Sequence, residues 1–484
     1  MYHSTRGNKL YNSKEALLLG LAPDRGLFVP DKIPHFWPEE KELNLSYQEI
    51  AKQIFKLYFT DFTDRELDEV VSLYNKESFP HKEISLSGTT DYAFLELYQG
   101  PTFAFKDMAL TVLPKLIEIA KRSEKEAKKT VVLTATSGDT GSAALAGFSK
   151  NDTNNIIVLY PKGKTSYIQE AQMLSFKNSH TFPIAITGTF DDCQRIVKDI
   201  FNNESFSNLD LISANSINIG RLIPQIVYYY VGYKELVERD FILYNEKINI
   251  VVPTGNFGNI LAAIIASRMG LPVNKIVCAS NENNVLTDFF QTGKYDANRE
   301  FLQTNSPAMD ILVSSNLERF LYFVYEDTNK INEIYNEFKL THKFSVSKED
   351  IKKVFPNLIS GYATRGETID AIHNSYKKNK ILIDPHTAVG YKVYNDSLKE
   401  LGYQFTLIVS TASPYKFSTT VCEALGLSGE SEKDRIDAIY QKSGKKVDNR
   451  LYDFLFQNKT RTVVEKDEAY KYVLNLLGEI NDKN

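Results

Sequence analysis

Short apolar runs rich in β-branched residues alternate with stretches of helical spacing between residues 91 and 282. Strands that alternate with helices form βαβ units, whose strands run parallel within a sheet. The alternation therefore predicts an α/β fold with mostly parallel sheets, in a chain long enough for about three domains. The runs cover residues 91–98, 130–135, 155–160, 181–187, 248–253 and 275–280, and two more strand signals follow at 381–384 and 405–411.

The regions on either side of these runs favour helices. Segments 46–60 and 64–75 have helical apolar spacing, and residues 300–378 combine that spacing with more charged residues. The polar tail shows helical patterning at 433–441 and 467–478. We therefore expect a mostly helical N-terminal region (1–90), a first α/β domain (91–225), a second α/β domain with a helical insertion (226–425, insertion 300–378) and a helical C-terminal tail (426–484).

Charge and composition exclude several classes of function. Lys and Arg total 57 and Asp and Glu total 61, so the net charge of −4 gives no reason to expect a nucleic-acid or membrane partner. The three cysteines, Cys193, Cys278 and Cys422, lie far apart and the histidines form no HExxH pattern, so neither a disulfide framework nor a metal site is expected. The N-terminus lacks the apolar stretch of a signal peptide, and no apolar run reaches the roughly 18 residues of a membrane span, so we expect a cytoplasmic protein.

The segment GPTFAFKDM at residues 100–108 places Lys106 between an apolar run and a predicted helix. Residues 91–98 predict a strand, Gly100 and Pro101 predict a turn, and helical spacing begins at Met108. A helix N-terminus and an apolar flank both disfavour a cation, so both lower the pKa of the Lys106 amine. An unprotonated amine can form an imine with a carbonyl compound. The alternative is a lysine that reaches from a helix into solvent, which is the commoner case.

Three predicted strands end in loops of small and polar residues, at 134–142, 253–259 and 409–414. In open α/β sheets, ligands bind beyond the carboxyl ends of the strands. The loop 253–259 has two glycines and precedes a helix, so its backbone N–H groups can bind an anion; the alternative is an ordinary turn. It lacks a Walker lysine and the GxGxxG spacing, which argues against an NTPase or a dinucleotide enzyme. The loop at 137–141 can bind a carboxylate or a second phosphate, or can simply cap a helix.

A phosphate loop, an imine-forming lysine and glycine-rich strand ends together suggest pyridoxal phosphate as the cofactor. Several longer motifs point the same way, among them SPAMDILVSSNLER at 306–319 and DPHTAVG at 384–390. With these motifs the chain resembles the threonine synthases, which are fold type II pyridoxal-phosphate enzymes, and in particular their longer bacterial and fungal branch. The resemblance implies a tryptophan synthase β-like fold with two open, parallel-sheet α/β domains. Its other motifs lie at 4–7, 20–24, 26–30, 100–109, 137–141, 160–163, 215–218 with Arg221, and 255–259.

The resemblance also implies a reaction, in which O-phospho-L-homoserine and water give L-threonine and phosphate in the last step of threonine biosynthesis. Lys106 is then expected to hold the cofactor as an imine and to move protons, Thr411 to face the pyridine nitrogen, and Asp139 to lie near the cofactor's 3′-oxygen or the substrate carboxylate. Gln99 and Ser413 stand where the family would have histidines. The cofactor phosphate is assigned to Gly255, Asn256, Phe257, Gly258 and Asn259, and the substrate to Ser137, Thr140, Lys164, Ser216, Asn218 and Arg221.

Two other readings remain open at this point. Another fold type II lyase, such as a threonine or serine dehydratase, would need the lysine and the glycine loop but no clamp for a substrate phosphate near Arg221. A catalytically inactive homologue that binds a partner would need none of these residues intact. For the enzyme we expect a small-molecule substrate, no nucleic-acid or membrane partner, and a monomer or weak homodimer.

Overall fold

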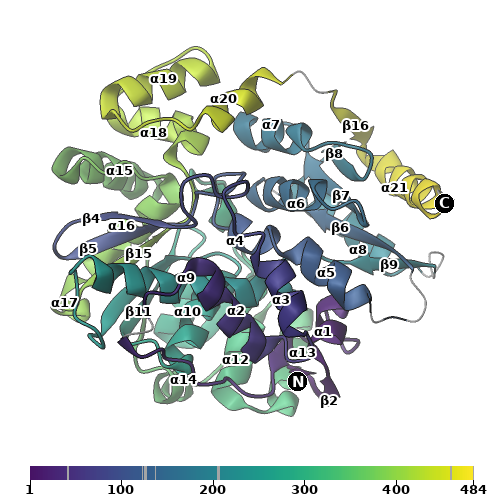
Figure 1. Ribbon diagram of the computed structural model, residues 1–484, viewed down its shortest axis with the longest axis horizontal. Coiled ribbons are helices and arrows are strands. Elements are labelled where there is room, and N and C mark those ends of the chain that lie inside the picture. The colour runs from purple at the N-terminus through teal and green to yellow at the C-terminus, as the bar shows by residue number, and fades with distance from the viewer. Residues whose placement is uncertain are drawn as a thin grey trace.

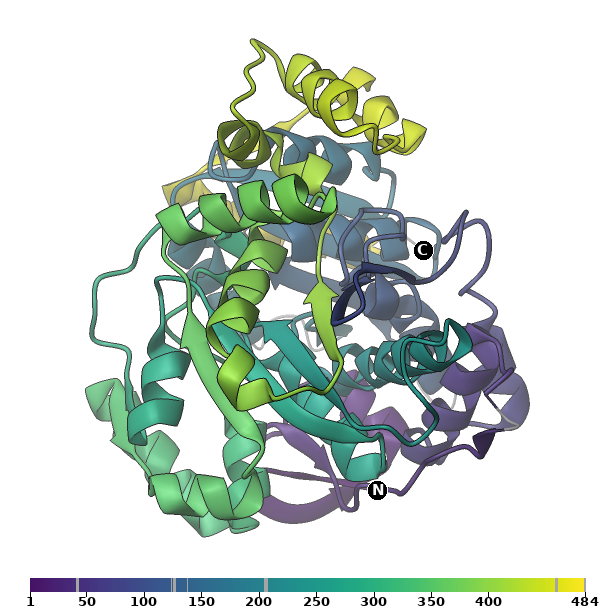
Figure 2. The same ribbon diagram turned by 90° about the vertical axis from the view of Figure 1, so that its left-hand side faces the viewer.

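The computed structural model describes residues 1–40, 43–122, 124, 128–136, 138–203, 208–457 and 460–482. Its frame consists of two open sheets whose strands run mostly parallel, each with helices on both faces (Figure 1). This confirms the predicted α/β class. The N-terminal elements lie at the opposite end of the molecule from the helices of residues 418–456, labelled α18 to α20, in both Figure 1 and Figure 2.

The larger sheet has six strands, and only its edge pair β4–β5 is antiparallel. Its inner strands are buried on both faces, which explains why they read as continuous apolar runs. Ile250 and Val252 of β10 face α9 (Ile219–Glu238) and α10 (Gly258–Met269), whereas Val251 faces α16 (Pro385–Asp396). The strand order is β14 (Leu358–Tyr362), β11 (Val273–Ser280), β10 (Ile248–Pro253), β15 (Thr406–Ser410), β5 (Tyr92–Glu96) and β4 (Ser85–Gly88).

The smaller sheet has five strands, all parallel. Alternate residues of its inner strand β6 face opposite layers of helices. Val132 belongs to the core with α5 (Leu113–Lys121) and α6 (Asp139–Ser149), and Val131 to the core with α8 (Phe190–Phe201) and α21 (Lys466–Asp482). The order is β16 (Thr462–Glu465), β8 (Thr181–Thr187), β7 (Asn154–Pro161), β6 (Lys129–Ala135) and β9 (Leu209–Ile212).

Helix α2 of the N-terminal region packs against α9, which itself covers one face of the larger sheet. Ser46 and Thr63 start α2 and α3 with capping boxes, in which the side chain three residues into the helix bonds back to the cap. A small antiparallel sheet precedes these helices. The elements are β1 (Tyr2–Ser4), β2 (Gly7–Tyr11), α1 (Ser13–Leu19), β3 (Phe28–Pro30), α2 (Tyr47–Tyr58) and α3 (Asp64–Val71).

The remaining elements lie outside the two large sheets. Those between residues 285 and 379 are α11 (Val285–Thr292), β12 (Lys294–Asp296), η3 (Pro307–Met309), α12 (Leu317–Tyr325), α13 (Thr328–Thr341), β13 (Lys343–Ser345), α14 (Lys348–Val354) and α15 (Arg365–Asn379). The others are α4 (Asp107–Leu110), α7 (Tyr167–Ser175), α17 (Leu398–Leu401), η4 (Pro414–Phe417), α18 (Ser418–Leu425), α19 (Glu432–Ser443) and α20 (Asn449–Phe456).

The structure differs from the sequence prediction in three ways. Residues 381–384 form no strand: Leu382 and Ile383 are buried, but Asp384 caps α16, so the apolar run leads into a helix. The predicted helical insertion contributes the parallel edge strand β14 to the larger sheet. Strands also cross the expected domain ranges, since β5 joins the larger sheet and β16 of the tail joins the smaller one. The four ranges themselves stay a prediction.

Candidate functional site

The site lies where the loops that follow β5, β6, β10 and β15 meet at the carboxyl ends of the two sheets. The loop after β5 is fixed to the loop after β15 by backbone hydrogen bonds: Phe105 N–H donates to the Thr411 carbonyl (2.8 Å) and Ser413 N–H donates to that of Phe103 (3.1 Å). Such crevices are where open α/β sheets bind ligands.

Asp107 shapes the loop that presents Lys106. Its buried carboxylate accepts hydrogen bonds from the Thr102 backbone N–H (2.8 Å) and hydroxyl (2.6 Å). Gly100 leaves space for this carboxylate, because a Cβ there would lie 2.5 Å from the Cβ of Asp107. The following helix, α4, has only four residues.

Lys106 is largely buried, with 13% of its side chain exposed, and its ammonium lies 5.4 Å from the centre of the Phe105 ring. The pKa of Lys106 is lowered to about 8, mainly by burial; the positive charges of Arg221 and Lys416 also lower it, and the negative charge of Asp139 opposes them. A shifted pKa was expected, but burial rather than a helix terminus is its main cause.

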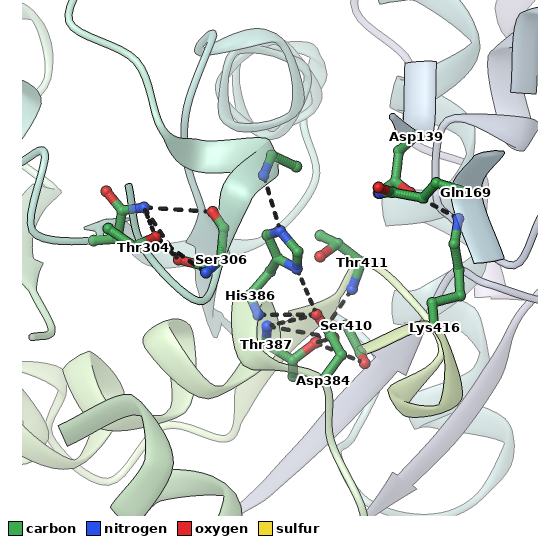
Figure 3. A network of polar contacts seen from close by, with 12 residues as sticks. Asp139, Gln169, Thr304, Ser306, Asp384, His386, Thr387, Ser410, Thr411 and Lys416 are labelled. Carbon is green, nitrogen blue, oxygen red and sulfur yellow. Dashed lines mark hydrogen bonds and ion pairs between the residues drawn. The ribbon is translucent and has the colours of Figure 1, made fainter. Parts of the chain in front are cut away.

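Asp139, in the first turn of α6, is the anion nearest to Lys106. One carboxylate oxygen, Oδ2, lies 3.8 Å from the Lys106 ammonium. The other, Oδ1, accepts hydrogen bonds from Gln169 Nε2 (2.9 Å) and Lys416 Nζ (2.7 Å), as Figure 3 shows. Burial raises the pKa of Asp139, but the positive charges of Lys416 and Lys106 outweigh it and hold that pKa well below its usual range. Asp139 is therefore a carboxylate shared by two lysines.

The loop after β10 leads into α10 without a side-chain cap, and Phe257 at the cap position has a φ of 62°. The positive φ thus falls on Phe257 and not on either glycine. Gly255 is needed for space: a Cβ there would lie 3.1 Å from the Ala308 carbonyl oxygen and 3.2 Å from Met309 Cα. The uncapped first turn of a 12-residue helix presents backbone N–H groups to an anion.

Asn259, in the same turn, carries a second sign of an anion site. Its Oδ1 accepts hydrogen bonds from the hydroxyls of Tyr228 (2.5 Å) and Tyr229 (2.6 Å). Its Nδ2 is buried and has no partner among the described residues. A buried donor without an acceptor is costly, and a phosphate oxygen would satisfy it.

A buried hydrogen-bond network around Asp384 supports the part of the site that contains Thr411 (Figure 3). His386 Nδ1 bonds to Asp384 (2.8 Å), and its Nε2 accepts the N–H of Ala308 (3.1 Å), which borders Gly255. Thr387 donates to Asp384 and accepts from the Thr411 N–H (3.3 Å). The network therefore holds Thr411 and Ala308 in place through the same buried carboxylate.

The other predicted substrate residues fall into different positions. Arg221 is 2% exposed; its Nη1 donates to the Ala214 carbonyl (2.6 Å), and its buried Nε has no partner in the part of the chain that the structure describes. Ser216 lies beside Gly258, with 3.7 Å between its Cβ and an ideal Cβ on Gly258. The Asn218 amide is engaged with Gly220 N–H and with the Leu17 and Ser213 carbonyls, so it caps α9.

Thr140 is half-buried next to Asp139, Lys164 is exposed in the turn after β7, and Ser137 lies outside the described residues. Sequence reasoning missed Lys416, Gln169 and His386. Lys416 follows the loop 409–414 by two residues and His386 lies inside the 384–390 motif, so position in these segments was the available signal. No group of three metal-ligating side chains occurs among the residues described.

Two family models match the chain. "Threonine synthase N terminus" matches residues 1–74, and "Pyridoxal-phosphate dependent enzyme" matches residues 84–333. The threonine synthase of Schizosaccharomyces pombe is 38% identical over 462 residues, which cover 88% of this chain and 89% of that protein.

The human protein "Threonine synthase-like 1" is also 38% identical, over 441 residues that cover 86% of this chain. The match covers 58% of the human protein, so this chain spans less than two thirds of that relative's length. Among solved structures, the pyridoxal-phosphate-bound threonine synthase of Brucella melitensis superposes with a TM-score of 0.89 at 31% identity, and covers 100% of this chain and 99% of that one.

Proposed function

Because this chain belongs to the threonine synthase family of pyridoxal-phosphate-dependent enzymes, we propose that it converts O-phospho-L-homoserine and water to L-threonine and phosphate. The observation that carries the proposal is a second pair of candidate anion donors, Arg221 and Ser216, in addition to the first turn of α10. Arg221 has a buried Nε without a partner among the described residues, and Ser216 borders Gly258. A substrate with its own phosphate would use this set, which a dehydratase does not need.

The residues of the site fit pyridoxal phosphate. The uncapped turn at Gly255, Asn256, Phe257, Gly258 and Asn259 would hold its phosphate, and the unsatisfied Asn259 Nδ2 suits a phosphate oxygen. Lys106 would attach it covalently, Thr411 would offer a neutral hydroxyl to the pyridine nitrogen, and Asp139 would face its 3′-oxygen side. When bound, this cofactor withdraws electrons from the α-carbon of an amino acid.

In this proposal Lys106 moves the protons. An amine with a pKa of about 8 holds and releases a proton near neutral pH, which is what a group that serves as base and then as acid needs. Lys106 would take a proton from Cα and release it, then take one from Cβ, and later return a proton to Cα. Arg221 and Ser216 would hold the substrate phosphate until it leaves, with Lys164 and Thr140 as further candidates.

The direct test is a coupled assay with the full chain, pyridoxal phosphate and O-phospho-L-homoserine. Equimolar phosphate and L-threonine support the proposal. Formation of 2-oxo acids from L-serine or L-threonine, without phosphate release from phosphohomoserine, would support the dehydratase reading instead.

We further propose that the enzyme is cytoplasmic and acts as a monomer or weak homodimer. No helix in the described ranges is long and apolar enough to cross a bilayer. Analytical ultracentrifugation of the full chain tests the oligomeric state.

Arg221→Ala is expected to weaken the use of phosphohomoserine by about 2–5 kcal/mol in kcat/KM, the scale of a lost buried charge contact. The planar guanidinium binds phosphate through paired hydrogen bonds, and alanine offers none. Cofactor absorbance should stay unchanged. The matched control is Arg195→Ala, because Arg195 is exposed and pairs only with Asp192 among the residues described. An Arg221→Ala protein with normal kcat/KM would move the phosphate clamp elsewhere.

Cofactor uptake by the apoprotein is expected to rise with pH and then level off above about pH 8. Only the neutral amine of Lys106 attacks an aldehyde, and its pKa of about 8 means that protonation limits the rate below that pH. The rate should change about tenfold per pH unit well below the pKa and little above it. Stopped-flow absorbance from pH 6 to pH 10 measures this profile. A rate that keeps rising beyond pH 9 would indicate a lysine with its ordinary pKa.

A further inference from the structure

Lys416 is a fully buried lysine whose position the proposed reaction does not use. None of its side chain is exposed, and it lies in η4, just after β15. Its ammonium donates to Asp139 Oδ1 (2.7 Å) and to the Thr102 carbonyl (2.8 Å). A lysine is almost never fully buried unless a charge partner compensates the lost hydration. Asp139 is that partner.

The Lys416–Asp139 pair connects the two sheets. Lys416 follows a strand of the larger sheet, whereas Asp139 follows β6 of the smaller one. Thr102, the second acceptor, belongs to the loop that presents Lys106. Lys416 therefore touches both the carboxylate beside Lys106 and the backbone that carries Lys106.

Asp139 has one oxygen occupied and one oxygen directed at Lys106. Oδ1 accepts from both Lys416 and Gln169, and Oδ2 lies 3.8 Å from the Lys106 nitrogen. The charges therefore alternate along the row from Lys106 through Asp139 to Lys416. With Oδ1 held by two donors, the carboxylate cannot turn without breaking a buried hydrogen bond.

We propose that Lys416 is a positioning residue: it fixes Asp139 in its ionised form with Oδ2 toward Lys106, and its own positive charge limits how strongly Asp139 holds a proton on Lys106. The consequence of this positioning for catalysis rests on the proposed role of Lys106. The effect on the Lys106 amine exists whether or not that amine carries a cofactor.

The sign of the effect follows from the groups that face Lys106. They are Asp139 on α6, Arg221 on α9, Lys416 on η4 and Asp107 on α4; Asp139 in turn faces His386 on α16. Lys416→Met removes a positive charge that repels the Lys106 ammonium and leaves that ammonium as the one lysine paired with Asp139 among the described residues. The protonated amine gains stability, so its pKa rises. Asp139→Asn removes the attraction and leaves two positive charges, so the pKa of Lys106 falls.

The experiment measures the Lys106 amine directly. The full chain, freed of cofactor, is acetylated with trace acetic anhydride between pH 6 and pH 11, and the Lys106 peptide is quantified by mass spectrometry. We expect the labelling midpoint to move up by about one pH unit or more in Lys416→Met and down in Asp139→Asn, the scale of one adjacent charge. Lys416→Arg should keep the wild-type midpoint, since it keeps the charge.

Lys445→Met is the matched control. It removes another lysine from an ion pair, with Glu96 (3.2 Å), on β5 and away from Asp139. Circular dichroism identifies the folded variants, and the upward and downward shifts test the proposal independently if one variant does not fold. An unchanged midpoint in either folded variant, or an equal shift in Lys445→Met, overturns it. If Lys106 shifts as expected but reduction traps the cofactor on another lysine, the proposed function fails while this inference stands.

Discussion

Lys106→Ala is expected to lower threonine formation from phosphohomoserine by about 10³-fold or more, because one residue supplies both the covalent attachment and the proton transfers. The variant should also lose covalent cofactor retention. Lys106 lies on a loop fixed by Asp107 and Thr102, and its pKa of about 8 suits both tasks. The measurement is the coupled phosphate and threonine assay, together with borohydride reduction and peptide mapping of the wild type.

The control for this variant is Lys162→Ala, because Lys162 is an exposed lysine in the turn after β7. It should keep wild-type activity and labelling. Reduction should place the pyridoxyl group on Lys106. A label on another lysine, or a Lys106→Ala protein with normal turnover, would remove Lys106 from its proposed role.

Gly255→Asp is expected to abolish cofactor retention in a folded protein. A Cβ at this position would lie 3.1 Å from the Ala308 carbonyl oxygen, so the loop must shift to accept any side chain. The new carboxylate would also oppose the phosphate: two charges about 4 Å apart at an effective dielectric of about 20 repel by about 4 kcal/mol, which corresponds to a roughly thousandfold weaker affinity. Equilibrium dialysis with pyridoxal phosphate measures the loss.

Gly366→Asp is a matched glycine control. Gly366 lies in the first turn of α15, a Cβ there meets nothing within 4 Å, and an acidic side chain is favourable at a helix start. This variant should bind the cofactor normally. Normal occupancy in folded Gly255→Asp would show that the loop does not hold the phosphate.

Much of the frame was predictable because parallel strands buried on both faces have a strong sequence pattern. The predicted strands 181–187 and 248–253 coincide with β8 and β10. The strand predicted at residues 381–384 does not form, because burial alone does not distinguish a strand from the segment leading into a capped helix. The short strand β16 depends on β8, a partner far along the chain, which no local pattern identifies.

The site residues were predictable only where they lie in a loop directly after a strand. The rule that ligands bind at the carboxyl ends of parallel strands pointed to the loops after β6, β10 and β15. It did not point to Lys416, whose partner Asp139 is 277 positions away, or to His386, whose imidazole bonds to a backbone N–H 78 positions away. The role of a buried polar group depends on the residues it contacts. Only the folded structure shows which distant residues those are.

The pairing of β16 with β8 also bears on how this chain folds. Residues 462–465 form an edge strand of the five-stranded sheet, parallel to a strand nearly 280 positions earlier. During synthesis β8 must therefore present an open edge while most of the chain is still being made. An unpaired parallel edge invites association with other chains, so this edge needs protection until β16 is made and pairs with it.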